Sequence, residues 1–143
     1  MSTSKNSISI DATRDEVAAL LFDPTSYASW SSSTPTAKVL ASDSEGRPTK
    51  VEMDIKAGPV KDHVTLDYDW SAGKDTVQFT LDEADMLTEM NGSYSINDDG
   101  DSVTVTYELT VGLSMPVPAM MRQKQEMDTI NKTLSELKAK AEG

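Results

Sequence analysis

The stretch SISIDATRDEVAALLFDPTSYASW, residues 7–30, contains the signals of a strand and a helix in immediate succession. Residues 7–12 alternate apolar and polar side chains, which predicts a half-buried strand. Thr13 and Glu16 match the capping box T-x-x-E, in which each residue satisfies a free backbone amide of the other. A helix is therefore predicted to begin near Arg14.

The same stretch also predicts where this helix ends and which element comes next. Asp23-Pro24 stops the helix, because proline disfavours the helical conformation of the residue before it. Pro24 suits a first helical turn, so a second short helix is predicted over 24–30. We expect Tyr27 and Trp30 to close one end of the core, with at most one of them touching a ligand.

Alternating apolar and polar residues dominate the chain from Pro35 to Gly112 and predict six further strands. These strands cover residues 37–41, 51–57, 60–70, 77–81, 86–96 and 103–111. The turn signals between them are short enough for hairpins. The pattern therefore predicts an antiparallel meander with one apolar and one polar face.

The last segment predicts one long helix. Pro116 and Pro118 suit its first turn, and about 25 residues lie between them and Gly143. Its predicted apolar stripe consists of Met120, Met127, Ile130, Leu134, Leu137 and Ala141. The concave face of the seven-stranded sheet is the one large apolar surface left to cover, so we expect the helix to lie across it.

Length and composition narrow the class of protein. The 143 residues fit one domain, predicted to span 1–143, and the chain has no cysteine, which excludes disulfides and thiolate metal sites. Lys and Arg number 13 against 24 Asp and Glu, a formal charge of −11 that disfavours nucleic acid as a partner. No apolar stretch approaches a membrane span, so we expect a cytoplasmic protein without stable membrane insertion.

The order of these elements resembles the helix-grip fold of the START-like superfamily, also called SRPBCC, which includes polyketide cyclase/dehydrases and lipid-transfer domains. Residues 10–30 are similar to its pattern I-x-A-x4-V-x5-D-x3-Y-x2-W. The resemblance implies an α+β fold: a seven-stranded curved antiparallel sheet around a long C-terminal helix, with two short helices after the first strand. It also implies a deep apolar cavity, but no single reaction, since members bind lipids or steroids, cyclise polyketides or assist chaperones.

The sequence offers few candidates for catalysis. His63 is the single histidine and lies out of phase with the apolar residues of its strand, so we expect it to face solvent. Asp62 shares the inward phase, which makes it a candidate base unless its carboxylate reaches water at the strand end. Tyr94 is a second weak candidate. We expect no arginine at the cavity, because Arg122 lies about 140° around the helix from Met127.

No metal-ligand spacing or cofactor motif is present, so we predict neither a metal nor a cofactor.

Aromatic and methionine side chains form the most informative set, because they can hold an apolar ligand loosely. The predicted ligand-binding residues are Trp30, Met53, Tyr68, Trp70, Phe79, Met90, Tyr94, Tyr107, Met120, Gln123 and Met127. The alternative is that the same side chains simply fill the core. Small residues such as Gly92 favour the cavity by leaving space.

We therefore predict a protein that binds or transports a small hydrophobic or aromatic molecule in an internal cavity. Two alternatives stay open. One is an enzyme similar to a polyketide cyclase/dehydrase, with polar groups from Asp62, Tyr68, Tyr94 and Gln123. The other is a protein-interaction adaptor whose acidic outer face docks a basic partner. The sequence does not predict the ligand or the oligomeric state.

Overall fold

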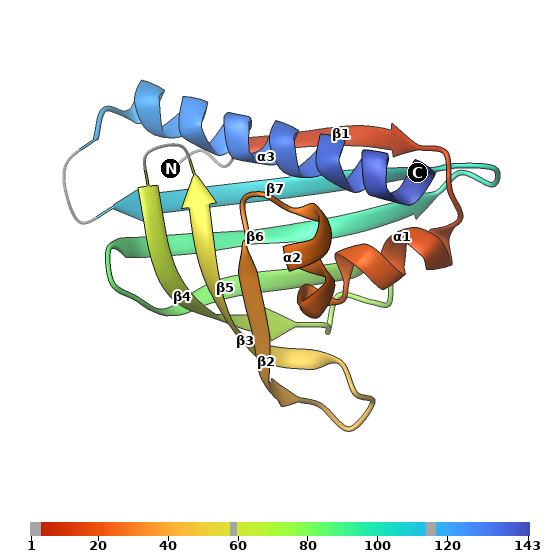
Figure 1. The fold of residues 1–143 in the computed structure, drawn as a ribbon, viewed down its shortest axis with the longest axis horizontal. Coiled ribbons are helices and arrows are strands. Elements are labelled where there is room, and N and C mark those ends of the chain that lie inside the picture. The colour runs from red at the N-terminus through yellow and green to blue at the C-terminus, as the bar shows by residue number, and fades with distance from the viewer. Residues whose placement is uncertain (1–3, 58–59, 114–116) are drawn as a thin grey trace.

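A computed structural model describes residues 4–57, 60–113 and 117–143 of the chain. Within these residues, seven strands form one antiparallel sheet in the order β1-β7-β6-β5-β4-β3-β2 (Figure 1). The strands are β1 (Ser4–Ile10), β2 (Thr36–Ser42), β3 (Pro48–Ala57), β4 (Val60–Asp69), β5 (Thr76–Ala84), β6 (Leu87–Asp98) and β7 (Val103–Leu113). The helices are α1 (Arg14–Leu21), the 3-10 turn η1 (Pro24–Ser26), α2 (Tyr27–Trp30) and α3 (Ala119–Glu142). The predicted helix-grip architecture is confirmed.

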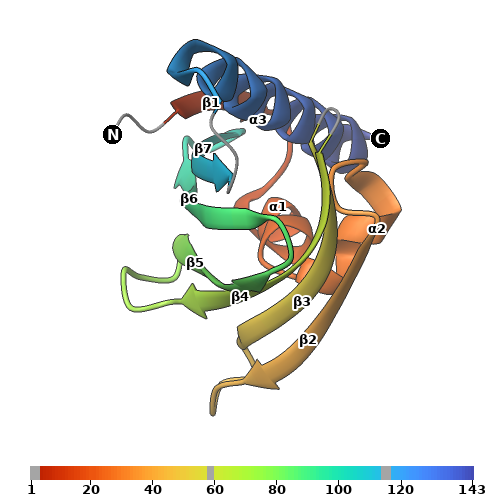
Figure 2. The ribbon, with the colours of Figure 1, turned by 90° about the vertical axis from the view of Figure 1, so that its left-hand side faces the viewer.

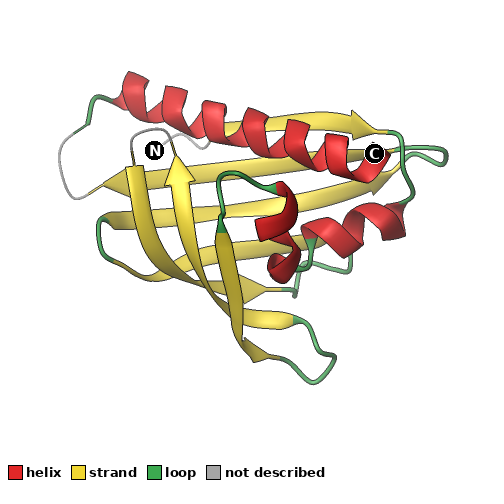
Figure 3. Cartoon of the chain, viewed as in Figure 1, coloured by secondary structure: helices red, strands yellow, loops and turns green. Residues whose placement is uncertain are grey.

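The sheet curves around the core, and the helices pack on its concave side (Figures 2 and 3). The long helix α3 contacts β1 and β7, and it also contacts α1 and α2. The short helix α1 packs against β6, and α2 packs against β2. The two short helices thus close the space between the curved sheet and α3 at one end.

The start of α1 is capped as the sequence predicts. The Thr13 hydroxyl accepts a hydrogen bond from the Glu16 backbone N–H, and the Glu16 carboxylate accepts one from the Thr13 N–H. The predicted second helix is divided in two. Its first part is the 3-10 turn η1, in which the Asp23 carboxylate accepts a hydrogen bond from the Thr25 N–H. Tyr27 then begins α2.

Strand β1 begins three residues earlier than the alternation predicts and ends at Ile10. Its first residues are polar and would not be assigned to a half-buried strand from local pattern alone. Contacts with α3 explain them: the Ser4 hydroxyl donates to Glu126, and the Asn6 amide donates to Asn131. The polar start of the strand is therefore held by pairing with β7, where Ser4 lies opposite Leu109, and by side-chain hydrogen bonds to α3.

The predicted apolar stripe of α3 is correct from Met127, which packs half-buried against the core, to the C-terminal end of the helix. Ile130, Leu134 and Leu137 are buried, but Met120 is 77% exposed, so its predicted inward position is wrong. The buried side chain in this part of the helix is Glu126. The first turns of α3 border a cavity, and apart from Met121 the side chains that they contribute to its wall are polar. Pro116 lies outside the described residues.

Gly92 lies where β6 crosses close to its neighbours. A Cβ atom at this position would lie 2.1 Å from the Glu108 carbonyl oxygen and 2.9 Å from the Phe79 ring. The space that the glycine leaves is therefore taken by the Glu108 backbone and by the ring of Phe79, which is the partner residue of Gly92 on β5. Gly92 permits this aromatic packing and does not itself enlarge the cavity.

Candidate ligand-binding cavity

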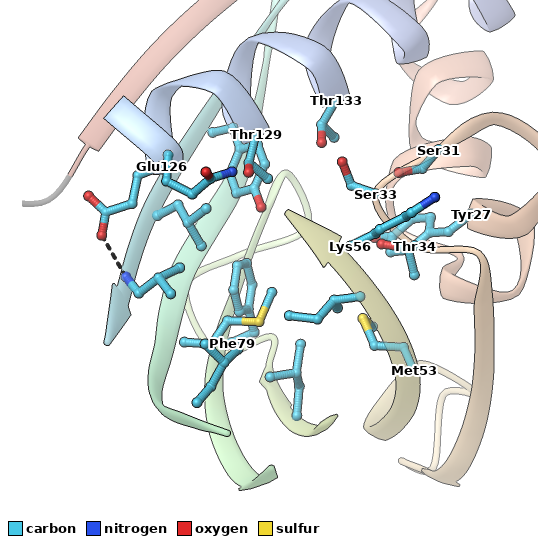
Figure 4. Close-up of a pocket in the computed structure, with 18 of the residues that line it drawn as sticks. Tyr27, Ser31, Ser33, Thr34, Met53, Lys56, Phe79, Glu126, Thr129 and Thr133 are labelled. Carbon is cyan, nitrogen blue, oxygen red and sulfur yellow. Dashed lines mark hydrogen bonds between the residues drawn. The ribbon is translucent and has the colours of Figure 1, made fainter. Parts of the chain in front are cut away.

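A cavity of about 290 Å³ lies between the concave face of the sheet and α3. Figure 4 shows side chains from the sheet, from α3 and from the segment between α2 and β2 converging on it. Its lining residues are Tyr27, Trp30, Ser31, Ser33, Thr34, Met53, Ile55, Lys56, Leu66, Tyr68, Phe79, Leu87, Met90, Tyr94, Tyr107, Leu109, Val111, Leu113, Val117, Met121, Arg122, Gln125, Glu126, Thr129 and Thr133. The wall is thus mostly apolar on the side of the sheet, where Lys56 is the exception, and mostly polar on the side of α3, where Met121 is the exception.

An aromatic cluster covers the middle of the sheet wall. Tyr68, Phe79, Tyr94 and Tyr107 come from β4, β5, β6 and β7, and the register brings them side by side. The Tyr94 and Tyr107 ring centroids are 4.4 Å apart, and Phe79 lies 5.6 Å from Tyr94 and 6.1 Å from Tyr68. Such contacts fix the rings as a surface against which a flat or flexible apolar molecule can pack.

The tyrosine hydroxyls of the cavity stay protonated at neutral pH. Burial raises the pKa of Tyr107 to about 12 and holds the pKa of Tyr94 well above its ordinary value. The pKa values of Tyr27 and Tyr68 are also raised, again chiefly by burial. These phenols can therefore donate hydrogen bonds, but they do not act as bases near neutral pH.

Tyr27 and Trp30 both lie in the cavity wall, where α2 closes one end of the grip. The Tyr27 hydroxyl donates to the Leu21 carbonyl, and the Trp30 indole N–H donates to the Ser26 hydroxyl at 3.1 Å. Their rings meet edge to face with centroids 5.3 Å apart. The Tyr27 hydroxyl and the Trp30 indole N–H are thus both hydrogen-bonded within the protein, so these residues contribute the apolar surface of their rings to the cavity.

The polar side of the cavity comes from one face of α3. At 100° per residue, positions 122, 126, 129 and 133 fall within about 60° of one another. Glu126 is only 1% exposed, and its carboxylate accepts hydrogen bonds from the Ser4 hydroxyl, the Val111 N–H and the Arg122 guanidinium at 2.7, 2.6 and 3.1 Å. Figure 4 draws the contact between Glu126 and the backbone of β7. This carboxylate thereby links α3 to β1 and β7.

The prediction that no arginine reaches the cavity is wrong for Arg122, which lines it and pairs with Glu126. The prediction takes Met127 as the centre of the inward face, whereas the part of α3 that lines the cavity is the face that carries Arg122, Glu126 and Thr133. The sequence does contain a signal for this polar face. Arg122 and Glu126 have the i, i+4 spacing of an ion pair on a helix, and Thr129 and Thr133 lie on the same face.

The predicted ligand-binding residues divide into two groups. Those in the cavity wall are Trp30, Met53, Tyr68, Phe79, Met90, Tyr94 and Tyr107. Four lie elsewhere. Trp70 is buried, and its indole N–H donates a hydrogen bond to the Pro48 carbonyl. Met120 and Gln123 are exposed, and Met127 is half-buried and packs against the core. The lining residues that sequence reasoning did not select include Arg122, Gln125, Glu126, Thr129 and Thr133.

Asp62 is buried and does not line this cavity; it borders a second pocket, together with His63 and Asp85. It accepts four backbone hydrogen bonds, from His63, Asp85, Met86 and Leu87, at 2.8 to 3.2 Å. Burial alone would raise its pKa, but the four N–H groups together outweigh burial and hold the pKa below its ordinary value. This arrangement anchors the turn between β5 and β6 and leaves the carboxylate poorly suited to act as a base.

His63 faces solvent, as predicted. Its Nδ1 atom lies 2.6 Å from the Asp54 carboxylate and its Nε2 atom 3.5 Å from that of Glu52, on the outer face of the sheet. The hydrogen bond with Asp54 raises the pKa of His63, and the nearby charge of Glu52 adds to the effect. The histidine lies on the opposite side of the sheet from the cavity.

Replacing His63 with glutamine is expected to lower stability at acidic pH only. The folded-state pKa is raised, so the protonated histidine stabilises the fold below its ordinary pKa of about 6.5, and this stabilisation is lost as pH rises through the folded value. Thermal unfolding of both proteins from mildly acidic to mildly alkaline pH measures the effect. A stability difference that grows with pH would contradict this assignment.

Nowhere in residues 4–57, 60–113 and 117–143 do three His, Asp or Glu side chains gather in a way that could hold a metal ion. No helix in the described part of the chain is long and apolar enough to cross a membrane.

Solved structures with the same fold cover almost the whole chain. A START superfamily protein from Mycobacterium smegmatis superposes with a TM-score of 0.92 at 20% identity, over 98% of this chain and 97% of that one. The Zhui aromatase/cyclase from Streptomyces sp. R1128 gives 0.74 at 12% identity, over 99% and 93%. A STAR-related lipid transfer protein from Xanthomonas axonopodis gives 0.75 at 17%, over 97% and 85%. The chain therefore has the START-like helix-grip fold.

The sequence itself identifies the family. Residues 1–142 match the family described as polyketide cyclase / dehydrase and lipid transport, and the chain belongs to it. No curated protein sequence matches the chain. Family and fold neighbours together indicate a cyclase/dehydrase or a lipid-binding protein of START-like type.

Proposed function

We propose that this protein binds a small hydrophobic or aromatic molecule in the cavity between the sheet and α3, as a carrier rather than an enzyme. The observation that carries the proposal is the aromatic cavity itself, with the rings of Phe79, Tyr94 and Tyr107 packed as one surface. A preformed, mostly apolar cavity with a few polar groups is the usual form of a small-molecule site.

The charged groups of the cavity support binding over catalysis. General acid–base chemistry needs a group that titrates near the working pH and is within reach of the substrate. Among the described lining residues there is no histidine and no aspartate, and the charges of Arg122 and Glu126 are paired with each other. Lys56 also contributes to the lining, but as a whole residue it is exposed.

Filling the cavity tests the proposal. Thr129→Trp places a large side chain on the cavity face of α3, whereas Lys132→Trp places the same side chain on an exposed position of the same helix. We expect Thr129→Trp to weaken binding of the fluorescent apolar probe N-phenyl-naphthylamine at least tenfold. The indole would occupy space in the cavity, so that about one ring of the probe could no longer be buried. Lys132→Trp should bind as the unaltered protein does. Equal binding by all three would contradict the proposal.

The alternative of a cyclase/dehydrase draws support from the neutral phenols of Tyr94 and Tyr107, which can donate hydrogen bonds to a carbonyl oxygen. Conversion of a poly-β-ketone analogue by the protein, lost in Tyr94→Phe, would favour this alternative. Binding without conversion would favour the carrier.

A further inference from the structure

Five hydroxyl groups of the cavity wall are without a hydrogen-bond partner among the described residues. Ser31, Ser33 and Thr34 lie between α2 and β2, and Thr129 and Thr133 lie on α3. Ser31, Ser33, Thr34 and Thr133 are 5, 8, 9 and 4% exposed. No fully enclosed side-chain oxygen or nitrogen of the described residues lacks a partner, so these hydroxyls border open space inside the cavity.

Their arrangement is directional. Figure 4 shows the hydroxyls of Ser33 and Thr133 directed toward one another, Ser33 from the segment before β2 and Thr133 from α3, with Thr129 one turn away on the same helix. We call the five residues Ser31, Ser33, Thr34, Thr129 and Thr133 the hydroxyl seam. The sheet side of the cavity carries Met53 and Phe79, which cannot satisfy the seam, beside the tyrosines of the aromatic cluster. The Tyr27 hydroxyl donates to the Leu21 carbonyl and not to the seam. The seam is thus a row of hydrogen-bonding groups along one side of an apolar space.

A hydroxyl left without a partner in an apolar cavity is costly, so such a group is normally satisfied by ordered water or by a ligand. A serine or threonine hydroxyl both donates and accepts, and therefore matches either a hydroxyl or a carbonyl group. Charge narrows the choice further. The guanidinium of Arg122 is already neutralised by Glu126, so the helix side of the cavity offers no unpaired charge to an ionised ligand. Lys56, the other cation among the described lining residues, lies on β3 and is an exposed residue.

We propose that the hydroxyl seam is a subsite for the hydroxyl or carbonyl groups of an uncharged, otherwise apolar ligand. This inference rests on the proposed function and specifies the chemistry of its ligand: an apolar body against the aromatic rings, and oxygen atoms along one edge against the seam.

A pair of probes that differ by one hydroxyl tests the inference. Naphthalene and β-naphthol are titrated, by displacement of N-phenyl-naphthylamine, into the unaltered protein and into the double variant Ser33→Ala/Thr133→Val. Both substitutions keep the side-chain volume close to the original. We expect the double variant to bind β-naphthol about tenfold more weakly and naphthalene within about twofold of the unaltered protein, since about one hydrogen bond is lost. Ser135→Ala, exposed on the same helix, should change neither.

Comparing the two probes on the same proteins removes the difference in their solubility. An equal change for both probes, or none for either, would overturn the seam as a subsite. If naphthoate binds the unaltered protein more tightly than β-naphthol does, the inference that the ligand is uncharged is overturned. If neither naphthalene nor N-phenyl-naphthylamine binds the unaltered protein, the proposed function itself fails.

Thermal unfolding of the apo double variant separates a binding role from a structural one. Groups that hold a ligand contribute nothing to the empty protein, so the melting temperature should be unchanged or higher. A fall in melting temperature would mean that the seam supports the fold, and would overturn the inference.

Discussion

Glu126→Ala is expected to lower the free energy of unfolding by about 3–5 kcal/mol. The substitution removes the acceptor of the Ser4 hydroxyl, the Val111 N–H and the Arg122 guanidinium at once. It leaves Arg122, whose side chain is only 17% exposed, without its counter-charge. Urea unfolding followed by tryptophan fluorescence measures the loss as a shift of the midpoint.

The same helix supplies a matched control. Lys124 and Asp128 form an ion pair with the same spacing, at 3.0 Å, but their side chains are 78 and 59% exposed. Asp128→Ala should therefore cost about 0.5 kcal/mol or less. Replacing both members of the buried pair, in Arg122→Met/Glu126→Leu, should recover much of the loss, because no charge is then left buried. If Glu126→Ala and Asp128→Ala lower the free energy of unfolding by similar amounts, burial does not make the Glu126 ion pair more stabilising than the exposed one.

Asp62→Asn is expected to cost about 2–4 kcal/mol, although the two side chains have nearly the same shape. Each carboxylate oxygen accepts two backbone N–H groups, from His63 and Asp85 on one side and from Met86 and Leu87 on the other. An asparagine amide would turn its NH₂ group toward one of these pairs of donors. The turn between β5 and β6 would lose half of its anchor.

The pH dependence of this loss has a definite sign. The folded-state pKa of Asp62 is lowered, so its stabilisation is complete well above the unfolded value of about 3.9 and is lost as pH falls through the folded value. The stability gap between the unaltered protein and Asp62→Asn should thus be widest near neutral pH and narrow in acid. Asp69→Asn, at an exposed residue of the same strand, should have a much smaller effect, and a gap that widens in acid would contradict the assignment.

The fold could be predicted from the sequence because its signals are local. The capping box at Thr13, the break at Pro24 and the alternation of Val103 to Val111 each specify an element without reference to the rest of the chain. Errors arose where a partner distant in sequence decides the outcome. Ser4 belongs to β1 because it pairs with Leu109 of β7, while its hydroxyl donates to Glu126, and no local pattern carries that information.

The candidate site was predictable on the side of the sheet and not on the side of α3. Tyr68, Phe79, Tyr94 and Tyr107 share the inward phase of consecutive hairpins, and period 2 is enough to bring them together. The inward face of α3 was sought as an apolar stripe, but its first turns border a cavity and carry polar side chains. Hydrophobic periodicity predicts which residues pack against one another in the core. It does not predict which polar residues line a cavity.

The topology of the sheet also determines when the core becomes complete during synthesis. Strands β2 to β7 pair with neighbours in sequence, so each hairpin can form soon after its second strand emerges from the ribosome. Strand β1 is made before the other six but must wait for β7, where Ser4 pairs with Leu109. The 24 residues of α3, which cover the concave face, are made after all seven strands. The nascent chain therefore exposes an apolar, strand-rich surface until α3 is translated, the stage at which aggregation competes with folding.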